Sequence, residues 1–521
     1  MNFPRRAKRR PPRARAALWS VVLIVGALLA SFAWATASPH GSSPDEDFHL
    51  TSIWCPTPLD QSCATKVRDD GTTLVEVPRA VSYASLCIAF DSSASGECVA
   101  DLDKEPVWGA RVDNGGFPGG FYDVMHWFVG PDVAASVMTM RIANAVLAIA
   151  LFAAVTALST PQARRVLVYG YLTISVPMAI YLIASVNPSG WAITGVAVAW
   201  AGLHGFLTQP EPRRRYALAG LALTGAGLAA MARADAGAFL GVVAAAIVAL
   251  HFPALRTRLR DVLAPVLVAV IGVIGFLYGG QSGALEGGLV VNRTPGGRAL
   301  LVDNFLGLPD LLIGSQKDAL NWVDTPVPAL TWVPIVLAAG ALAFLGLRAL
   351  NLPKTIALLG LVGVYVALPL YMLQISGAPV GTYVQARYLT PLVPVIMATA
   401  LWNPLQRRVP RLTFTQSALV FGALSIGHSA VLHTQIRRFV TGLDVSSPNL
   451  NTNIEWWVSP VSPMATWMVG SLGFALLALS LFLVGRNLPG DEVAGGVVRV
   501  CPVSGSVALS GEGGGAHPVL P

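Results

Sequence analysis

The chain has 521 residues, of which 54% are hydrophobic and only 12% are charged. Soluble globular proteins carry about a quarter charged residues, so this composition excludes an ordinary soluble enzyme and predicts a polytopic membrane protein. The net charge of +7 would suit a nucleic-acid partner, but seven basic residues fall in the first fifteen positions, directly before an apolar segment. That placement is typical of a cytoplasmic anchor, so we expect no nucleic-acid partner.

The first apolar span, 17–36, is too long for an ordinary signal-peptide core, and we interpret it as a retained signal anchor. Cleavage is the alternative, because the span ends in small residues at 35–38. Later apolar runs are also long enough to cross a bilayer, which gives about twelve predicted transmembrane helices. We therefore predict an all-α polytopic membrane domain over 17–485, between a basic tail at 1–16 and a disordered tail at 486–521. The other predicted spans are 134–157, 166–186, 191–208, 216–233, 236–254, 261–279, 328–347, 356–374, 389–402, 414–434 and 466–485.

Basic residues give an independent prediction of the orientation. If the N-terminus is cytoplasmic, alternation of the spans places every basic connection on that same side, as the positive-inside rule requires. Both termini are therefore predicted to be cytoplasmic. The basic connections are 164–165, 213–215, 256–260, 348–354 and 407–411.

The first connection on the other side, 37–133, is long enough to form a small fold of its own. It holds Cys55, Cys63, Cys87 and Cys98, while the fifth cysteine lies in the C-terminal tail. Four clustered cysteines outside the cytoplasm predict two disulfides in an oxidising compartment. Of the three connectivities we favour local pairing, Cys55 with Cys63 and Cys87 with Cys98. A zinc site is the alternative, but the sequence has no close Cys-x-x-Cys pair to support it.

The most unusual stretch of the chain is 43–49, just after the first span, with three carboxylates and a histidine. Ser43 can cap a helix there, and Pro44 suits the first position of that helix. Glu46 falls at the capping-box position whose side chain accepts the backbone N–H of the N-cap residue. This pattern predicts a short helix that runs to about Trp54.

Asp45 and His49 are four residues apart, so this helix would place them on one face. One interpretation is that the acids only complement the helix dipole. The other is that a dense acidic patch at the membrane surface forms a functional site.

A second polar cluster, 383–391, precedes a late span. Arg387 lies between Tyr383 and Tyr388, and an arginine at the lipid boundary can bind a phosphate with two hydrogen bonds while the rings lie among headgroups. The alternative is that Arg387 binds no ligand and only extends its charged end to the membrane–water interface, where the tyrosines form part of an aromatic belt. The presence of Gln385 in the same segment favours a functional site.

Other polar residues are weaker candidates. Arg141 lies inside the second span, where a charge needs either a function such as substrate binding or a structural partner among the loop carboxylates. Arg233 and Asp235 are predicted to pair at a tight turn. Charged or polar residues of another loop that could serve an anionic substrate are Asn292, Arg293, Arg298 and Lys317. Histidines predicted to be structural, without metal-ligand spacing, are His204, His251, His428 and His433.

The two polar motifs together resemble those of the bacterial membrane proteins grouped as domain of unknown function 2142. The early motif, Pro-Asp-Glu-x-x-His, ends here at His49, and the late motif, Gln-Gly-Arg-Tyr followed by prolines, begins here at Gln385. Ala386 replaces the usual glycine of the late motif, which leaves the local turn geometry open. The segment 187–190 also resembles a family segment. The resemblance covers about 17–485 and implies a bacterial plasma membrane.

That family in turn resembles the C-type glycosyltransferases, which implies a membrane enzyme that moves a sugar from a polyprenyl-phosphate carrier to an envelope glycan or protein acceptor. An acidic pair in the first outer loop is the catalytic landmark of those enzymes. The resemblance implies that Asp45 acts as the base or holds a divalent metal (Mg or Mn), with Glu46 as its partner and His49 as an orienting group. Arg387, with Gln385 and Tyr388, would bind the lipid phosphate.

Two other functions fit parts of the sequence. A transporter or flippase usually has charged sites near the middle of the bilayer, whereas most spans here are apolar in the middle. A noncatalytic envelope assembly factor would explain the cysteine-bearing loop but not the acidic cluster or Arg387. A shared pocket for Asp45 and Arg387 would favour the enzyme.

Overall fold

The computed structural model describes residues 13–102, 104–173, 175–280, 294–313, 320–402 and 412–487. Most of the two predicted tails, with Cys501, and the basic connection 407–411 lie outside these residues. The inner ends of the tails are helical, because 13–16 belong to the first helix and 486–487 to the last. Within them, ten helices are long and apolar enough to cross a membrane, and all ten match predicted spans. They are α1 (Arg13–Thr36), α7 (Val133–Leu158), α10 (Pro188–Thr208), α11 (Pro212–Ala232), α12 (Ala234–Leu255), α13 (Leu263–Tyr278), α17 (Ala329–Leu347), α18 (Leu352–Ile375), α21 (Phe414–Val440) and α22 (Pro463–Asn487).

The two remaining predicted spans are interrupted. The span predicted at 166–186 consists of α8 (Pro161–Thr173) and α9 (Met178–Ile183). The span predicted at 389–402 becomes α19 (Ala386–Leu389) and α20 (Leu392–Leu401). Pro177 precedes α9 and Pro391 precedes α20. Because proline lacks an N–H, it cannot donate the backbone bond of a continuous α-helix, and each interruption falls beside such a residue.

Helix α10 is the centre of the bundle, and nearly all its residues are buried. It packs closely on α11 because glycines face each other across the contact. A Cβ atom at Gly195 would lie 2.5 Å from the carbonyl oxygen of Gly225. Such small residues allow two membrane helices to approach backbone to backbone, where van der Waals contact stabilises them.

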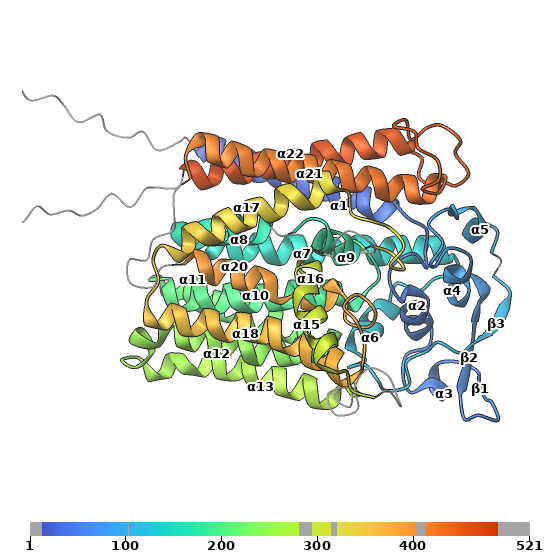
Figure 1. The fold of residues 1–521 in the computed structure, drawn as a ribbon, viewed down its shortest axis with the longest axis horizontal. Coiled ribbons are helices and arrows are strands. Elements are labelled where there is room, and N and C mark those ends of the chain that lie inside the picture. Colours follow the sequence, from blue (N-terminus) through green and yellow to red (C-terminus); the bar gives the residue numbers. More distant parts are fainter. Residues whose placement is uncertain are drawn as a thin grey trace, which may run out of the picture. The chain divides into compact units, whose positions relative to one another are not determined.

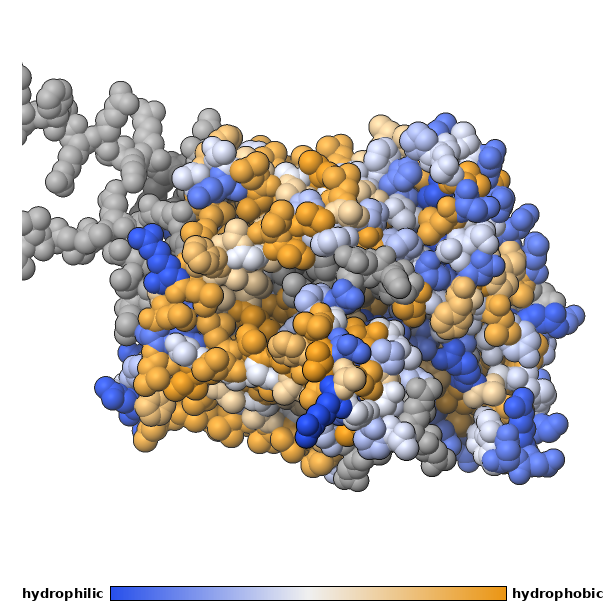
Figure 2. All heavy atoms as spheres, viewed as in Figure 1, coloured by the Kyte–Doolittle hydropathy of each residue, from blue (hydrophilic) through white to orange (hydrophobic). Residues whose placement is uncertain are grey.

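The loop between α1 and α7 has its own fold, called here the loop domain (residues 37–132). It gathers at one end of the helices, to the right in Figure 1, and hydrophilic side chains collect over that end in Figure 2. Two disulfides join Cys55 to Cys63 and Cys87 to Cys98, so the predicted local pairing is confirmed. The helices of this domain are α2 (Glu46–Trp54), α3 (Leu59–Ser62), α4 (Arg79–Ser82), η1 (Ala84–Cys87), α5 (Glu97–Ala100) and α6 (Gly120–His126).

The loop domain also holds a small antiparallel sheet that the all-α prediction did not include. Its strands are β1 (Thr65–Val67), β2 (Thr73–Pro78) and β3 (Pro106–Gly109), with β2 in the centre. The sheet keeps Val75 and Val77 in the core, while all three residues of β1 are exposed at its edge. The membrane-spanning part of the fold remains entirely helical in the described residues.

A buried arginine of α21 fastens the loop domain to the helices. Arg438 donates to the carbonyl oxygens of Ile88 and Asp91, at 2.7 and 2.8 Å. The same guanidinium lies 3.0 Å from the carboxylate of Asp324, and both side chains are almost fully buried. One cation thus ties the loop domain and the 320–325 segment to α21, which fixes the surfaces that surround the acidic stretch.

Candidate functional site

The acidic stretch begins helix α2 differently from the prediction. Asp45, and not Ser43, is the N-cap, and its backbone is left-handed with φ of 57°. Glu46 Oε2 does accept the backbone N–H of Ser43 at 2.9 Å, so one half of the predicted capping box is present. The helix ends at Trp54, as predicted. Aspartate tolerates left-handed backbone better than most residues, and such a strained position is often a functional one.

Asp45 lies between two arginines from distant parts of the chain. Its Oδ2 is 2.7 Å from Arg387 Nη2, across 342 positions of sequence. Its Oδ1 is 2.8 Å from Arg111 Nη2. The Asp45 side chain is 37% exposed, whereas that of Arg387 is 6% exposed. The front and the back of the polypeptide therefore meet at one carboxylate on the loop-domain side of the bundle.

Arg387 has a second polar partner and one unused nitrogen. Its Nη2 also donates to the hydroxyl of Tyr388 at 3.0 Å, and its guanidinium lies 5.0 Å from the centre of that ring. Arg233 lies over the same ring at 4.7 Å and forms the predicted ion pair with Asp235, at 2.9 Å. Arg387 Nη1 is buried without a hydrogen-bond partner in the described part of the chain. A buried unpaired donor is costly, so this nitrogen is suited to donate a hydrogen bond to a ligand oxygen.

The predicted neighbours of Arg387 do not all engage it. Gln385 is half-buried and precedes α19, where its carbonyl oxygen accepts the Tyr388 N–H at 3.0 Å. Ala386 is the first residue of α19. Because alanine adopts helical backbone freely, its replacement of the family's glycine is compatible with the local geometry.

Arg111 is a site residue that the sequence analysis missed. It donates from Nη1 to both carboxylate oxygens of Asp47, at 2.9 and 3.0 Å, as well as to Asp45. Its guanidinium lies 5.4 Å from the ring centre of Trp322, whose indole N–H donates to Gly41. A single arginine in a polar loop has no distinguishing sequence pattern, so only the folded structure identifies it.

His49 lies on the same helix as Asp45, four residues further on, as predicted. Its Nδ1 is 3.0 Å from the hydroxyl of Tyr122, a second residue that the sequence analysis missed. Burial lowers the pKa of His49 to about 3; Asp45 opposes this shift, and Arg387, Arg233 and Arg111 add to it. His49 is therefore neutral near pH 7 and serves the site as a hydrogen-bonding group and not as a cation.

Glu46 and Arg141 form a separate, fully buried pair. Arg141 Nη2 lies 3.2 Å from Glu46 Oε1, and the two side chains are 3% and 0% exposed. The same guanidinium donates to the carbonyl oxygens of Ala35, Ser38 and Pro39, at 2.7 to 2.9 Å. These contacts match the structural role that the sequence left open for Arg141. They also turn Glu46 away from Asp45 and bind the end of α1 to α7.

The segment 187–190 is also part of this region. Asn187 donates from Nδ2 to the carbonyl oxygen of Pro44, at 2.8 Å. Its Oδ1 accepts the N–H of Ser189 and so caps α10. One amide thus joins the central helix of the bundle to the turn that carries Asp45.

The groups around Asp45 do not suit a divalent metal. Both of its oxygens face guanidinium groups, Glu46 is bound to Arg141, and His49 faces Tyr122 through Nδ1. No group of three or more possible metal ligands is present in the described residues. Mg²⁺ and Mn²⁺ require several oxygen ligands with a negative balance, whereas here two cations already share the one carboxylate. The residues around Asp45 therefore do not form a site for Mg²⁺ or Mn²⁺.

The remaining predicted polar residues lie away from this cluster or outside the described residues. Arg298 is exposed at the start of α15 (Arg298–Gly307). His204 contacts His251 at 3.1 Å, and His428 accepts from Trp34 at 3.0 Å. Those outside the described residues are Asn292, Arg293 and Lys317.

Comparison with solved structures gives weak similarities. ArnT from Cupriavidus metallidurans in the apo state shares 14% identity, with 91% of this chain and 78% of that chain covered and a TM-score of 0.44. ArnT of the same organism bound to undecaprenyl phosphate shares 15% identity, with 91% and 79% covered and a TM-score of 0.40. Arabinosyltransferase EmbB from Mycobacterium smegmatis shares 12% identity, with 93% and 42% covered and a TM-score of 0.35. These similarities are too weak to assign an activity.

Comparison with curated proteins gives no match. A family model described as "Predicted membrane protein (DUF2142)" matches residues 28–396, which include both polar motifs and most of the bundle. The match covers well over half of the chain. The protein therefore belongs to the DUF2142 family of predicted membrane proteins.

Proposed function

We propose that this protein is an integral-membrane glycosyltransferase that moves a sugar from a polyprenyl-phosphate carrier to a cell-envelope acceptor. The observation that carries the proposal is the contact between Asp45 and Arg387, at 2.7 Å, beside a buried and unpaired Arg387 Nη1. A carboxylate and a phosphate-binding cation at one membrane surface are the two groups that such a transfer needs. The reaction class itself comes from the resemblance of the two motifs to C-type glycosyltransferases.

The resting site keeps Asp45 weakly basic. Burial alone would raise the pKa of Asp45, but Arg387 and Arg111 together lower it below its ordinary value. A carboxylate held in this way is a poor proton acceptor, since general bases work best with a pKa near the working pH. The site therefore needs a change before Asp45 can act.

Binding of the donor supplies that change. The phosphate of the carrier competes with Asp45 for Arg387, because guanidinium groups bind phosphate through two parallel hydrogen bonds. Once Arg387 turns to the phosphate, Asp45 Oδ2 loses one cation and the pKa of its carboxyl rises. Binding of the donor thus makes Asp45 a stronger proton acceptor.

The transfer step needs no reactant other than the donor lipid and the acceptor. The acceptor hydroxyl attacks the anomeric carbon, a new carbon–oxygen bond forms, and the bond from that carbon to the phosphate oxygen breaks. The hydroxyl proton moves to Asp45, and the electron pair remains on the polyprenyl phosphate, where Arg387 offsets the charge. Arg111 positions Asp45 from its other side through the hydrogen bond to Oδ1.

The test compares lipid-linked sugars in a deletion strain that carries the wild type, Asp45→Asn or Asp60→Asn. Asp60 is an exposed carboxylate of the same loop domain and serves as the matched control. We expect the donor lipid to accumulate in the deletion strain and with Asp45→Asn, whose transfer rate should fall by about a hundredfold or more. The wild type and Asp60→Asn should both restore transfer. Full restoration by Asp45→Asn, at equal protein level, would remove Asp45 from the mechanism.

A further inference from the structure

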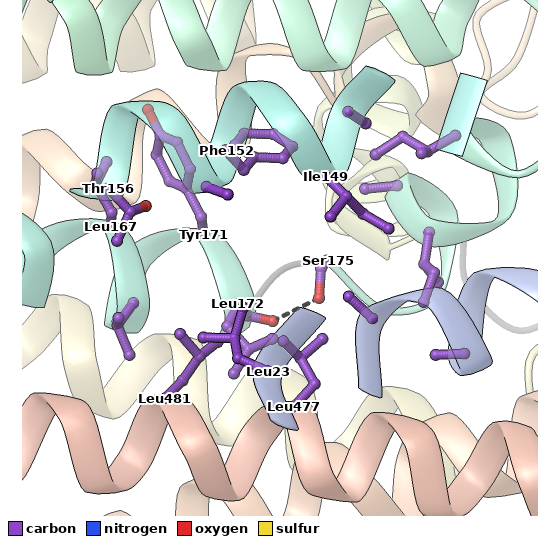
Figure 3. Close-up of a pocket in the computed structure, with 18 of the residues that line it drawn as sticks. Leu23, Ile149, Phe152, Thr156, Leu167, Tyr171, Leu172, Ser175, Leu477 and Leu481 are labelled. Carbon is purple, nitrogen blue, oxygen red and sulfur yellow. Dashed lines mark hydrogen bonds between the residues drawn. The ribbon is translucent and has the colours of Figure 1, made fainter. Parts of the chain in front are cut away.

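An apolar cavity of about 530 Å³ lies within the helix bundle, away from the cluster around Asp45. Its walls come from α1, α7, α8, α9 and α22, with Ile193 and Ala197 from α10 and Pro394 from α20. In Figure 3, Ile149 and Phe152 of α7 lie across the space from Leu23, Leu477 and Leu481. The volume is in the range of small-molecule sites, which commonly occupy 300–1,000 Å³.

The shape of the cavity matches one hydrocarbon chain. Ser20 and Ser31 of α1 both line it, and their separation along the helix is about 16 Å at 1.5 Å per residue. The hydrocarbon core of a bilayer is about 30 Å thick, so the cavity spans roughly one leaflet. Ile24 lines it and is 40% exposed, so the cavity opens towards the surrounding lipid.

The polar groups in the wall do not call for a polar ligand. Tyr171 donates its hydroxyl to the carbonyl oxygen of Ala197 at 2.7 Å. Ser175 donates to the carbonyl oxygen of Leu172 at 2.8 Å, as the dashed line in Figure 3 shows. Because these hydroxyls are already satisfied by the backbone, the occupant of the middle of the cavity is apolar.

One end of the cavity carries a positive charge. Among the lining residues, Arg164 alone is charged. It donates from Nε to Thr156 and from Nη2 to Ala157, at the end of α7, and has no carboxylate partner among the described residues. Helix α7 starts at the loop domain, so Arg164 lies at the opposite end of the bundle from Asp45. The same basic end carries Arg165 and 213–215.

We propose that this cavity binds one anionic glycerophospholipid from the leaflet on the basic side. One of its two acyl chains fills the space between α1, α7 and α22, the other lies in the surrounding bilayer, and its phosphate pairs with Arg164. An apolar slot one leaflet long with a cation at its mouth complements such a lipid in both shape and charge. The donor carrier is a different ligand, because its phosphate belongs with Arg387 at the other end of the bundle. The bound lipid would fill the interruption between α8 and α9 and so stabilise the fold.

The test is native mass spectrometry of the purified full-length protein after exchange into mixed micelles of phosphatidylglycerol and phosphatidylcholine. We expect the wild type to retain one phosphatidylglycerol. Ala153→Phe and Ala27→Phe, which fill the cavity from opposite walls, should lose it. Leu337→Phe, at a 68% exposed position of α17, is the matched control and should keep it.

Arg164→Gln tests the charge at the mouth. It should lower the preference for phosphatidylglycerol over phosphatidylcholine by about fivefold, since one basic residue near a lipid headgroup contributes about 1 kcal/mol. Arg348→Gln, at an exposed arginine that ends α17, should leave the preference unchanged. Equal binding of both lipids by the wild type, retention of a polyprenyl lipid in place of the phospholipid, or equal retention by Ala153→Phe and Leu337→Phe would each overturn the proposal. The wild-type comparison holds even if a filling variant does not fold.

Discussion

Replacement of Arg141 with methionine should destabilise the protein more than replacement of Glu46 with glutamine. Removal of one partner from a buried ion pair costs about 3–5 kcal/mol. Arg141 also satisfies three backbone carbonyl groups, and each one left unpaired adds about 1 kcal/mol or more. We therefore expect at least about 5 kcal/mol for Arg141→Met, which is comparable with the whole stability of many domains.

Glu46→Gln keeps more of the local network. Glutamine can still accept the N–H of Ser43, and Arg141 keeps its three carbonyl partners, so the loss is confined to the two contacts between Arg141 Nη2 and the Glu46 oxygens. We expect a loss of about 2–3 kcal/mol. If Glu46 only holds the turn, transfer activity per folded molecule should stay within about tenfold of the wild type, whereas loss of a reacting group would cost far more.

The assay is chemical unfolding of the purified protein in mixed detergent micelles, followed by circular dichroism. Arg214→Met is the control, because Arg214 pairs with Glu211 on the surface, where both side chains are about half exposed. Such a pair is worth about 1 kcal/mol or less. Equal destabilisation by Glu46→Gln and Arg141→Met, or a cost of Arg141→Met no larger than that of the control, would contradict these structural roles.

Four further changes test the site and its frame. Arg387→Lys should lower sugar transfer by about a hundredfold with little change in melting temperature, because lysine cannot bind a carboxylate or phosphate through a planar fork. Burial lowers the pKa of His49 from 6.5 to about 3, so the unfolded chain takes up a proton before the folded protein does, and the free energy of unfolding falls as pH drops from 6.5 towards 3. At pH 5 this loss of stability is about 2 kcal/mol. His49→Gln should abolish it in pH-dependent unfolding. Cys87→Ser should cost about 3 kcal/mol in unfolding experiments, because the unfolded loop is no longer closed. Asn187→Ala should cost about 1–2 kcal/mol and lower transfer, because both the α10 cap and the bond to Pro44 are lost.

Each of these has a clear contrary result. Full activity of Arg387→Lys would mean that a point charge suffices at that position. An unchanged difference in stability between pH 7 and pH 5 for His49→Gln would show that the imidazole is not held neutral by burial. Because Cys87→Ser keeps the Cys55–Cys63 bond, reductant should destabilise this variant less than the wild type, whereas an equal effect of reductant on both would argue against a stabilising Cys87–Cys98 bond. A melting temperature of Asn187→Ala equal to the wild type would show that the link to Pro44 contributes nothing.

Hydropathy alone predicted most of the membrane architecture. Ten long spans follow from runs of about twenty apolar residues, since the bilayer requires each span to satisfy its own backbone. The local disulfides also followed from the sequence, because closely spaced cysteines pair readily. The interruptions between α8 and α9 and before α20 were not predicted, because length and hydropathy do not register where a proline ends a helix.

The residues of the candidate site were likewise predictable only in part. Asp45, His49 and Arg387 were identifiable because their motifs are local and resemble a family pattern. Composition and spacing alone could not show that Asp45 touches Arg387, because 342 positions separate them and only the packed bundle closes that distance. Arg111 was not identifiable, since an isolated arginine in a loop has no pattern of its own.

The sequence by itself determined which segments enter the membrane and which residue types gather on the loop-domain side, because both depend on local composition. Only the tertiary structure decided which charges pair. In the folded protein Glu46 pairs with Arg141 in the core, whereas Asp45 pairs with Arg387 and Arg111. The physical reason is that the pairing of charges depends on distance and burial, and these arise only when remote segments pack together.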